Sequence, residues 1–315
     1  MIRLAIVSPC YNEEAVLEES AARLSLLLNE LIDDKRITDN SFILYVNDGS
    51  KDKTWEIIQR LHETNTFVCG LNLSHNVGHQ NAIMAGMMKA RLLADATITI
   101  DADLQDDLQA IKRMVKLHEE GNDIVYGVKV SREADPWAKK LSAQMFYRLQ
   151  EKMGVKSVYN HADFRFMSRR ALNALAEYPE RNLYLRGMIP MLGFKTATTE
   201  DVISPRIAGE SKYTLQKMLR LASDGITSFS TKPIELIISV GLVMMLIAFG
   251  MFCYVLISVF TNHYTAGWAS IMMSLWFIGS VVTLAIGVVG TYIGKIYIEV
   301  KKRPLYNIAD ELLRE

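Results

Sequence analysis

The chain has 315 residues, half of them hydrophobic, and its 35 Lys and Arg residues balance 35 Asp and Glu residues, so the formal net charge is zero. A balanced charge argues against a dedicated nucleic-acid-binding protein, which normally carries an excess of basic residues. The three cysteines are far apart and odd in number, so they fit no disulfide framework or zinc site and favour a reducing compartment. The first residues read directly as a strand, without the apolar region of a signal peptide.

Short buried strands and amphipathic helices are predicted to alternate along the first part of the chain. Strands are expected at 4–8, 42–46, 68–73, 97–100 and 123–126, and helices at 15–31, 54–62, 80–94 and 108–120. This alternation predicts an α/β fold with a parallel, right-handed, mostly doubly wound sheet. The sequence has neither a Gly-x-Gly-x-x-Gly motif after its first strand nor a P-loop, so a nicotinamide dehydrogenase and a P-loop enzyme both fit poorly.

The predicted strand at 97–100 is followed by two carboxylates, Asp101 and Asp103. Because alternate residues of a strand share a face, both can aim at one point, with Gln105 next in that register. Carboxylate and amide oxygens suit Mg²⁺ or Mn²⁺, and open α/β sheets bind ligands at the carboxyl ends of their strands. The alternative is an acidic turn in which Asp106 and Asp107 cap the next helix.

After residue 105 the pattern is less regular. The predicted elements are a basic, proline-containing connection at 131–140, a helix at 141–153, a strand at 162–166, a helix at 181–192, a flexible basic loop at 203–212 and an amphipathic helix at 212–229. The last of these could lie in a membrane interface, because its basic and apolar residues alternate at helical spacing.

Two apolar helices are predicted to follow, at 234–260 and 269–293, and residues 236–294 contain no Asp, Glu, Lys or Arg. Each exceeds the roughly 20 apolar residues that cross a bilayer. Basic residues lie before the first helix and after the second, so the positive-inside rule puts both the large domain and the C-terminus in the cytoplasm. Two buried helices of a soluble protein are the alternative. Glycines in both helices indicate close packing, within the hairpin or between subunits.

A set of motifs occurs in a recognisable order along the chain. They are Pro-Cys-Tyr-Asn-Glu-Glu at 9–14, Val-Asn-Asp-Gly-Ser-Lys-Asp at 46–52, Asn-Val-Gly at 76–78, Asp-Ala-Asp-Leu-Gln-Asp at 101–106, Asp-Phe-Arg at 163–165, Arg-Ile-Ala-Gly-Glu-Ser-Lys at 206–212 and Asp-Gly-Ile-Thr-Ser-Phe-Ser at 224–230. Together they resemble the family-2 inverting glycosyltransferases with the GT-A fold. With the apolar helices, they resemble the polyprenyl-phosphate glycosyltransferases, the group of bactoprenol glucosyltransferase and dolichol-phosphate mannose synthase. The resemblance covers essentially the whole chain.

The resemblance implies roles for particular residues. Those implied to bind the nucleotide are Pro9, Tyr11, Asn12, Glu13, Asp48 and Asp101, with Asp48 bonding to the base. Those implied to hold a divalent cation, Mg²⁺ or Mn²⁺, at the donor diphosphate are Asp101, Asp103 and Gln105. Asp163 matches the family's proposed base, and Asp103 is the second implied catalytic residue.

Positions near the donor or acceptor phosphates are implied for Arg132, Lys140, Ser142, Arg186, Arg206, Ser211 and Lys212. One departure is Lys129, where relatives often have arginine. Lysine keeps the charge but loses the bidentate geometry of a guanidinium, so phosphate binding through that position is in doubt.

The implied reaction is a single displacement with inversion. A polyprenyl (undecaprenyl) phosphate attacks the anomeric carbon of a nucleotide-sugar, giving a lipid-linked sugar for cell-envelope glycosylation. A phosphate ester's second pKa lies near about 6, so the nucleophile is already mostly dianionic at neutral pH. We therefore expect Asp163 to orient the acceptor or its surroundings. UDP-glucose is the expected donor, with UDP-N-acetylglucosamine next and GDP-mannose behind.

Other functions fit the sequence less well. A processive polysaccharide synthase usually carries a Gln-x-x-Arg-Trp motif and more membrane helices, and the sequence has neither. A catalytically inactive membrane adapter would not need an intact Asp101, Asp103 and Gln105 set. A flippase needs a polar path that two helices and a short outer loop do not offer. His75 and His79 could suggest a metal site, but a loop or helix-start role is favoured.

The sequence therefore predicts a GT-A catalytic domain at 1–210, a juxtamembrane amphipathic region at 211–232, two transmembrane helices at 233–296 and a cytoplasmic tail at 297–315. The expected location is the cytoplasmic membrane, as a multi-pass protein with its catalytic domain and C-terminus in the cytoplasm. The expected partners are a nucleotide-sugar, a polyprenyl phosphate and the membrane, with no nucleic acid. A homo-oligomer, tetramer or dimer, is also expected.

Overall fold

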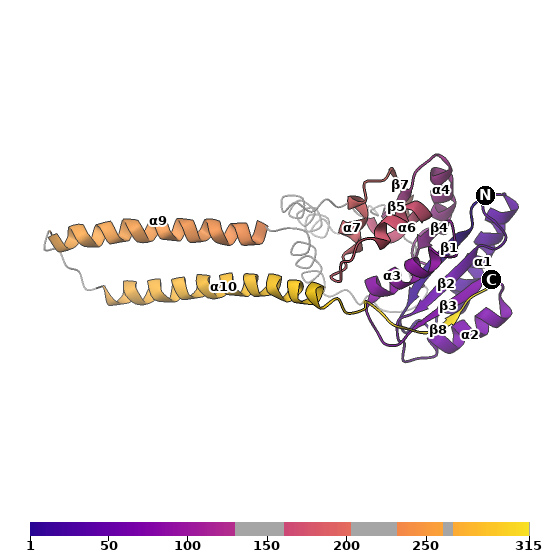
Figure 1. Ribbon diagram of the computed structural model, residues 1–315, viewed down its shortest axis with the longest axis horizontal. Helices are drawn as coiled ribbons and strands as arrows, with labels where there is room; N and C mark the ends of the chain where they lie inside the picture. The colour runs from indigo at the N-terminus through magenta and orange to yellow at the C-terminus, as the bar shows by residue number, and fades with distance from the viewer. Residues whose placement is uncertain (130–160, 203–231, 261–266, 315) are drawn as a thin grey trace.

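The computed structural model describes residues 1–129, 161–202, 232–260 and 267–314. It has a globular α/β part from which two long helices project side by side (Figure 1). Several predictions lie outside the described residues. They are the elements expected at 131–140, 141–153, 203–212 and 212–229 and the phosphate contacts of Arg132, Lys140, Ser142, Arg206, Ser211 and Lys212.

The described strands form one eight-stranded sheet in the order β7-β5-β6-β4-β1-β2-β3-β8. Their bounds are β1 Leu4–Cys10, β2 Phe42–Asn47, β3 Val68–Leu73, β4 Ala96–Thr99, β5 Ile124–Lys129, β6 His161–Ser168, β7 Thr196–Asp201 and β8 Ile308–Leu312. Strands β4, β1, β2 and β3 are parallel to one another, as are β5 and β7. Strands β6 and β8 run antiparallel to their neighbours. The expected α/β fold with a mostly parallel sheet is confirmed.

Helices cover both faces of this sheet. The helices on the sheet are α1 Leu17–Asp33, α2 Thr54–Thr64, α3 His79–Ala90, α4 Leu108–Glu119, α6 Arg169–Ala176 and α7 Leu185–Met191, and the two projecting helices are α9 Lys232–Phe260 and α10 Trp268–Lys301. The helices α1, α2 and α4 pack on one face, and α3, α6 and α7 on the other. Helix α7 is shorter than the helix expected at 181–192, and α6, β7 and β8 were not predicted.

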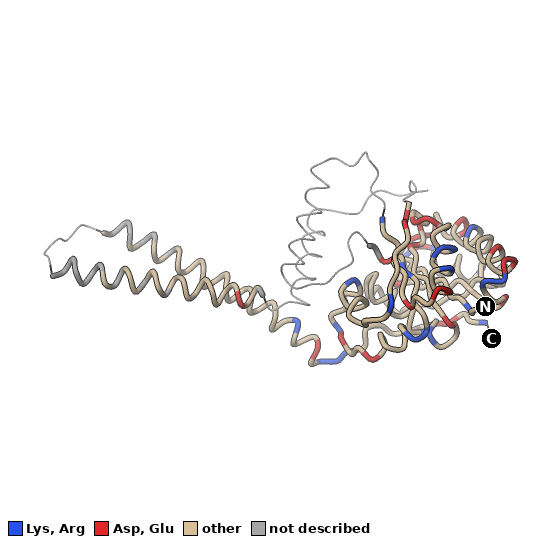
Figure 2. Tube along the Cα trace, turned by 90° about the horizontal axis from the view of Figure 1, so that it is seen from above, with Lys and Arg blue, Asp and Glu red and all other residues tan. Residues whose placement is uncertain are grey.

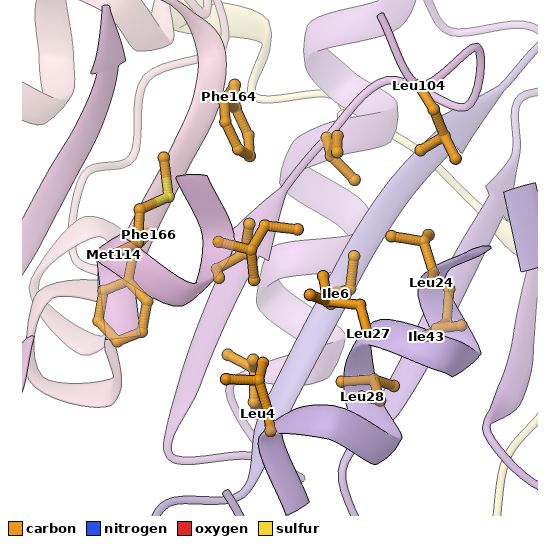
Figure 3. Packing of buried hydrophobic residues seen from close by; sticks show 14 of the residues in the cluster. Leu4, Ile6, Leu24, Leu27, Leu28, Ile43, Leu104, Met114, Phe164 and Phe166 are labelled. Atoms are coloured by element: carbon orange, nitrogen blue, oxygen red, sulfur yellow. The ribbon is translucent and has the colours of Figure 1, made fainter. Parts of the chain in front are cut away.

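The core follows the two-residue period of the strands. Leu4 and Ile6 of β1 face α1, whereas Ala5 and Val7 face α3. Leucines of α1 at helical spacing, among them Leu28, lie against β1 and β2 (Figure 3). Burying one such leucine contributes about 1.5–3 kcal/mol.

Helix α3 approaches the sheet closely at Gly86. A β-carbon there would lie 2.3 Å from Cγ1 of Val7 and 2.8 Å from Cγ2 of Val46, so only glycine allows this contact. The helix therefore rests directly on β1 and β2. Its first residue, His79, consequently lies at the end of the sheet where the parallel strands terminate.

The projecting helices α9 and α10 supply the apolar part of the chain. Figure 2 shows charged residues gathered on the globular part and near its junction with the helices. Among the described residues, one segment, Phe277–Lys301, is long and apolar enough to cross a membrane, and a second apolar stretch, Pro233–Met244, is shorter. Of the two membrane-spanning helices that the sequence predicts, the second is thus supported by its length and composition, and the first is not shown to be a span.

After α10 the chain returns to the globular part. Strand β8 pairs with β3, and Nδ2 of Asn72 donates to Asp310 at 2.8 Å. Glu311 forms an ion pair with Lys89 of α3, and Nη2 of Arg314 donates to the Asn65 carbonyl at 3.3 Å. Part of the segment expected to be a tail is therefore the edge strand of the sheet.

Candidate active site

The carboxyl ends of β1, β2 and β4 meet at one edge of the sheet. The strand order reverses between β1 and its two neighbours, which is where open α/β sheets bind ligands. A cleft of about 620 Å³ lies there. It is lined by Pro9, Cys10, Tyr11, Glu13, Asp48, Asn76, Gly78, His79, Gln80, Ala82, Asp101, Ala102, Asp103, Gln105, Lys129, Asp163 and Arg186.

Asp48 locks two loops of the cleft together. Its Oδ1 accepts from the backbone N–H of Val77 at 2.7 Å and its Oδ2 from that of Gly78 at 3.0 Å. The next residue, Gly49, has φ +60°, and a β-carbon there would lie 2.5 Å from the nitrogen of Asn76. Both carboxylate oxygens of Asp48 therefore already accept hydrogen bonds from the backbone of the loop at 76–78. Each keeps a further lone pair, and its contact with a base stays a prediction.

The residues expected around the nucleotide divide into two groups. Pro9, Tyr11 and Glu13 line the cleft, and Tyr11 is 39% exposed. Asn12 supports the loop: its Oδ1 accepts from the backbone N–H of Lys51 at 2.9 Å, and its φ is +56°. Asn12 therefore acts on the shape of the loop.

Asp101, Asp103 and Gln105 all line the same cleft, on a turn that follows the end of β4 at Thr99. The intervening Leu104 is 1% exposed, has φ +46° and belongs to the core cluster, which anchors the loop. Within the described part of the chain, no three His, Cys, Asp or Glu side chains are grouped so that they could hold a metal by themselves. The all-oxygen donor set, completed by the Gln105 amide and by ligand oxygens, fits Mg²⁺ or Mn²⁺.

The site concentrates negative charge. The side chain of Asp101 is 53% exposed to the open cleft. Desolvation by the surrounding residues raises its pKa; the charge of His79 opposes this, and the neighbouring carboxylates Asp163 and Asp103 raise it further. Asp106, 5% exposed, has its pKa raised to about 8 by burial and by the charge of Asp101. A bound cation would relieve this repulsion, in keeping with the donor set.

Asp163, near the start of β6, is the centre of an ionic cluster. Its Oδ1 accepts from Nη2 of Arg165 at 2.6 Å, and its Oδ2 lies 3.1 Å from Nη2 of Arg186 and 3.4 Å from Nε2 of His79. Burial alone would raise the pKa of Asp163, but Arg186, His79 and Arg165 outweigh it and hold the pKa well below its usual range. Asp163 is therefore a carboxylate at neutral pH and a weak proton acceptor.

His79 joins the two acidic groups of the cleft. It is the first residue of α3, as the sequence predicted, but its Nε2 also lies 3.7 Å from Asp101. Its side chain is 46% exposed. Desolvation by the cleft lowers its pKa, yet the hydrogen bond to Asp163 and the charge of Asp101 outweigh this and raise the pKa above the ordinary value. Sequence reasoning missed this role; the available signal was the position of His79 directly after a predicted strand and turn.

The structure also gives positions to two basic residues to which the sequence assigned no definite role, Arg165 and Lys129. Arg165, in the Asp-Phe-Arg motif, is 1% exposed and points with Asp163 toward the α3 side of the sheet. Lys129 ends β5, lines the cleft and places its Nζ 3.7 Å from Asp106. Asp107 caps α4 by accepting from the backbone N–H of Gln109, so the capping alternative is confirmed for Asp107.

Comparisons with known proteins agree with this geometry. Residues 5–176 match the family described as Glycosyl transferase family 2. The chain is 46% identical over 312 residues to the uncharacterized glycosyltransferase YkoT of Bacillus subtilis (strain 168), covering 99% of this chain and 93% of that relative. It is 35% identical to a prophage bactoprenol glucosyl transferase homolog of Escherichia coli (strain K12), covering 98% of each chain.

The SfII prophage-derived bactoprenol glucosyl transferase of Shigella flexneri is 39% identical over 269 residues, covering 84% of this chain and 86% of that relative. The matched family segment contains β1 to β6 and therefore every strand end that borders the cleft. Because the family model matches more than half of the chain and the relatives that the chain matches over nearly its whole length are named glycosyltransferases, the chain belongs to glycosyl transferase family 2 and is a glycosyltransferase.

Proposed function

We propose that the protein transfers glucose from UDP-glucose to polyprenyl (undecaprenyl) phosphate with inversion, on the cytoplasmic face of the membrane. The product is a lipid-linked sugar for cell-envelope glycosylation. One observation supports the proposal above all others. The acidic cleft, in which Arg186 pairs with Asp163, lies in the globular part of the chain, and the end of α10, a helix apolar enough to cross a bilayer, is attached to that same part. The relatives named bactoprenol glucosyl transferase support the acceptor and the sugar.

In the proposed step, a phosphate oxygen of the acceptor forms a bond to the anomeric carbon of the sugar. The bond from that carbon to the diphosphate oxygen breaks, and its electron pair leaves with the nucleoside diphosphate. Mg²⁺ or Mn²⁺ held by Asp101, Asp103 and Gln105 would neutralise charge on the departing diphosphate.

Asp163 acts as an orienting group in this proposal. Its low pKa leaves it ionised and unsuited to remove a proton. The acceptor does not require a base, since a phosphate monoester with a second pKa near about 6 is mostly dianionic at neutral pH. Asp163 instead holds Arg186 and His79 in place within the cleft, through contacts of 3.1 Å and 3.4 Å to its Oδ2.

The chain's return to the sheet supports the proposed topology. Strand β8 pairs with β3, so the segment after α10 lies on the same side of the membrane as the catalytic part. A chain that leaves and re-enters one compartment crosses the membrane an even number of times. We therefore infer that α9 and α10 cross together as a hairpin. Association into a dimer or tetramer through these glycine-bearing helices stays a prediction.

The test uses the full-length protein in vesicles that contain undecaprenyl phosphate. Labelled UDP-glucose, UDP-N-acetylglucosamine and GDP-mannose are supplied in separate reactions, and the lipid products are resolved by chromatography and mass. We expect a hexosyl undecaprenyl phosphate from UDP-glucose, and about 1000-fold slower formation of it by Asp103→Ala. A product from one of the other donors would replace the proposed sugar. Absence of any lipid product would favour the catalytically inactive adapter.

A further inference from the structure

The end of α10 is tied to the loop that precedes α7. The carboxylate of Glu299 accepts from the backbone N–H of Arg181 through both of its oxygens, each at 2.9 Å, and from that of Asn182 at 2.7 Å. Glu299 is half-buried at this contact. Leu305, beyond α10, packs against the same cluster of apolar residues that contains α7. The contact is therefore part of a packed junction.

The tied loop leads directly into the active site. Arg186 lies four residues after Asn182, at the start of α7, and holds Asp163. A second acceptor fixes the same segment from the cleft side, because Oε1 of Gln80 accepts from the backbone N–H of Leu185 at 3.0 Å. Residues 181–186 thus form a short bridge with α10 at one end and the catalytic cleft at the other.

The position of Glu299 along α10 determines how far the bridge lies from the apolar segment of the helix. The uncharged stretch of the chain ends at Gly294, and Glu299 follows five residues later in the same continuous helix. At 1.5 Å per residue, the carboxylate lies roughly 7 Å beyond the apolar segment. The helix is continuous, so this contact near its end helps to set the height of the cleft above the bilayer, together with the packing of Leu305.

We infer that Glu299 is a positioning residue: it ties the membrane helix to the segment that carries Arg186 and so aligns the Asp163–Arg186 pair with the lipid phosphate. The inference rests on the proposed function, since it takes the acceptor to be a phosphate held at the bilayer surface. It assigns Glu299 no contact with either substrate. Its loss should therefore affect the use of the acceptor far more than the binding of the donor.

The test compares the full-length wild type with Glu299→Ala and Glu299→Gln in vesicles containing undecaprenyl phosphate. We expect kcat/KM for the lipid acceptor to fall roughly 10- to 100-fold in Glu299→Ala, because small displacements of reacting groups cost rates of this order. The affinity for UDP, measured by calorimetry on the same samples, should stay unchanged. Glu299→Gln keeps one acceptor oxygen and should lose less.

The matched control is Glu311→Gln. Glu311 also joins the returning C-terminal segment to the globular part, through Lys89, but it does not touch the bridge. This variant should keep the wild-type acceptor kinetics. If Glu299→Ala does not fold, Glu299→Gln, checked for a wild-type melting temperature, carries the comparison.

A double-mutant cycle separates positioning from general stability. If Glu299 acts through Arg186, then Glu299→Ala should add little to the loss caused by Arg186→Ala. Fully additive losses, or wild-type acceptor kinetics in both Glu299 variants, would overturn the inference. A wild-type protein that glycosylates no lipid phosphate would instead overturn the proposed function.

Discussion

Arg186 engages both carboxylate oxygens of Asp163, with Nε 3.4 Å from Oδ1 and Nη2 3.1 Å from Oδ2. The pair joins α7 to β6, and Oδ2 of the same carboxylate lies 3.4 Å from Nε2 of His79. A carboxylate matched by two guanidinium groups is held ionised and in place, which suits a role in orientation more than one in proton transfer.

The first prediction concerns Asp163→Asn. The variant leaves the buried guanidinium of Arg165 without its counter-charge, so we expect a loss of about 3 kcal/mol in the free energy of unfolding. The displaced Arg186 should lower turnover by about 100-fold. Asp163 itself does not titrate from about pH 6 to about pH 8, so any change of the loss across this range should follow His79, whose pKa Asp163 raises.

The control for this variant is Asp123→Asn, which removes the acidic partner of Arg170 away from the cleft and should keep turnover. A near-normal rate in Asp163→Asn at about pH 7.5 would remove Asp163 from the chemistry. A loss that still grows or vanishes across the neutral range when His79 is replaced by glutamine in both proteins would instead restore Asp163 as a proton acceptor.

The second prediction concerns acid stability. The folded state holds the pKa of Asp163 well below the ordinary value of about 3.9 that applies in the unfolded chain. The stabilisation is thus fully present above about pH 4 and is lost as the pH falls through the folded pKa, because the unfolded chain binds the proton first. The midpoint urea concentration for unfolding of the wild type should decrease as the pH is lowered below about 4, and that of Asp163→Asn should decrease less. Parallel curves would contradict this.

The third prediction concerns the metal. Asp101→Ala and Asp103→Ala should each lower turnover by about 1000-fold, which corresponds to about 4 kcal/mol of lost stabilisation of the departing diphosphate. Chelation of the wild type should have the same effect, and added Mg²⁺ or Mn²⁺ should reverse it. Gln109→Ala, a change to an exposed side chain on the following helix, is the control. Full activity in a chelated sample would refute the role of a cation.

The acidic side of the site could be predicted from the sequence, because it depends on local geometry. Asp101, Asp103 and Gln105 follow the end of β4 within six residues, so the position of that strand end places all three at the carboxyl edge of the sheet. Their alternation as in a strand does not persist, because the chain turns at residues 102–103 and Leu104 has φ +46°. The cluster around Asp163 could not be predicted in this way. His79 and Arg186 come from α3 and α7, and they meet Asp163 only because these helices pack side by side on one face of the sheet.

The missed edge strands have a similar explanation. Strand β7, Thr196–Asp201, is rich in threonine and acidic residues and lacks the alternation of apolar residues that predicts a half-buried strand. Strand β8, Ile308–Leu312, is short, mostly exposed and distant in sequence from its partner β3. Its pairing depends on the chain's return after α10, which no local pattern reveals.

The fourth prediction concerns Gly49→Ala. Alanine at φ +60° costs about 1–2 kcal/mol, and its β-carbon would also collide with the backbone of His75 and Asn76. The collision should push apart the two loops that Asp48 joins, so we expect a raised KM for the nucleotide-sugar as well as lower stability. Gly193→Ala is the matched control: its φ is +71°, but a β-carbon there would meet no atom within 4 Å. It should lose stability only. Equal KM values for the two variants would show that the loops are not coupled.

The last prediction concerns the route of the chain through the membrane. Because β8 pairs with β3, the residues on either side of the two apolar helices must lie in one compartment. A green fluorescent reporter that matures only in the cytoplasm should fluoresce when fused after residue 314 of the full-length chain. The same reporter fused to a chain truncated within 261–266 should stay dark, since α9 would carry it across. Fluorescence from both fusions would show that the helices lie along the surface, and darkness of the full-length fusion would show that an odd number of crossings separates β8 from β3.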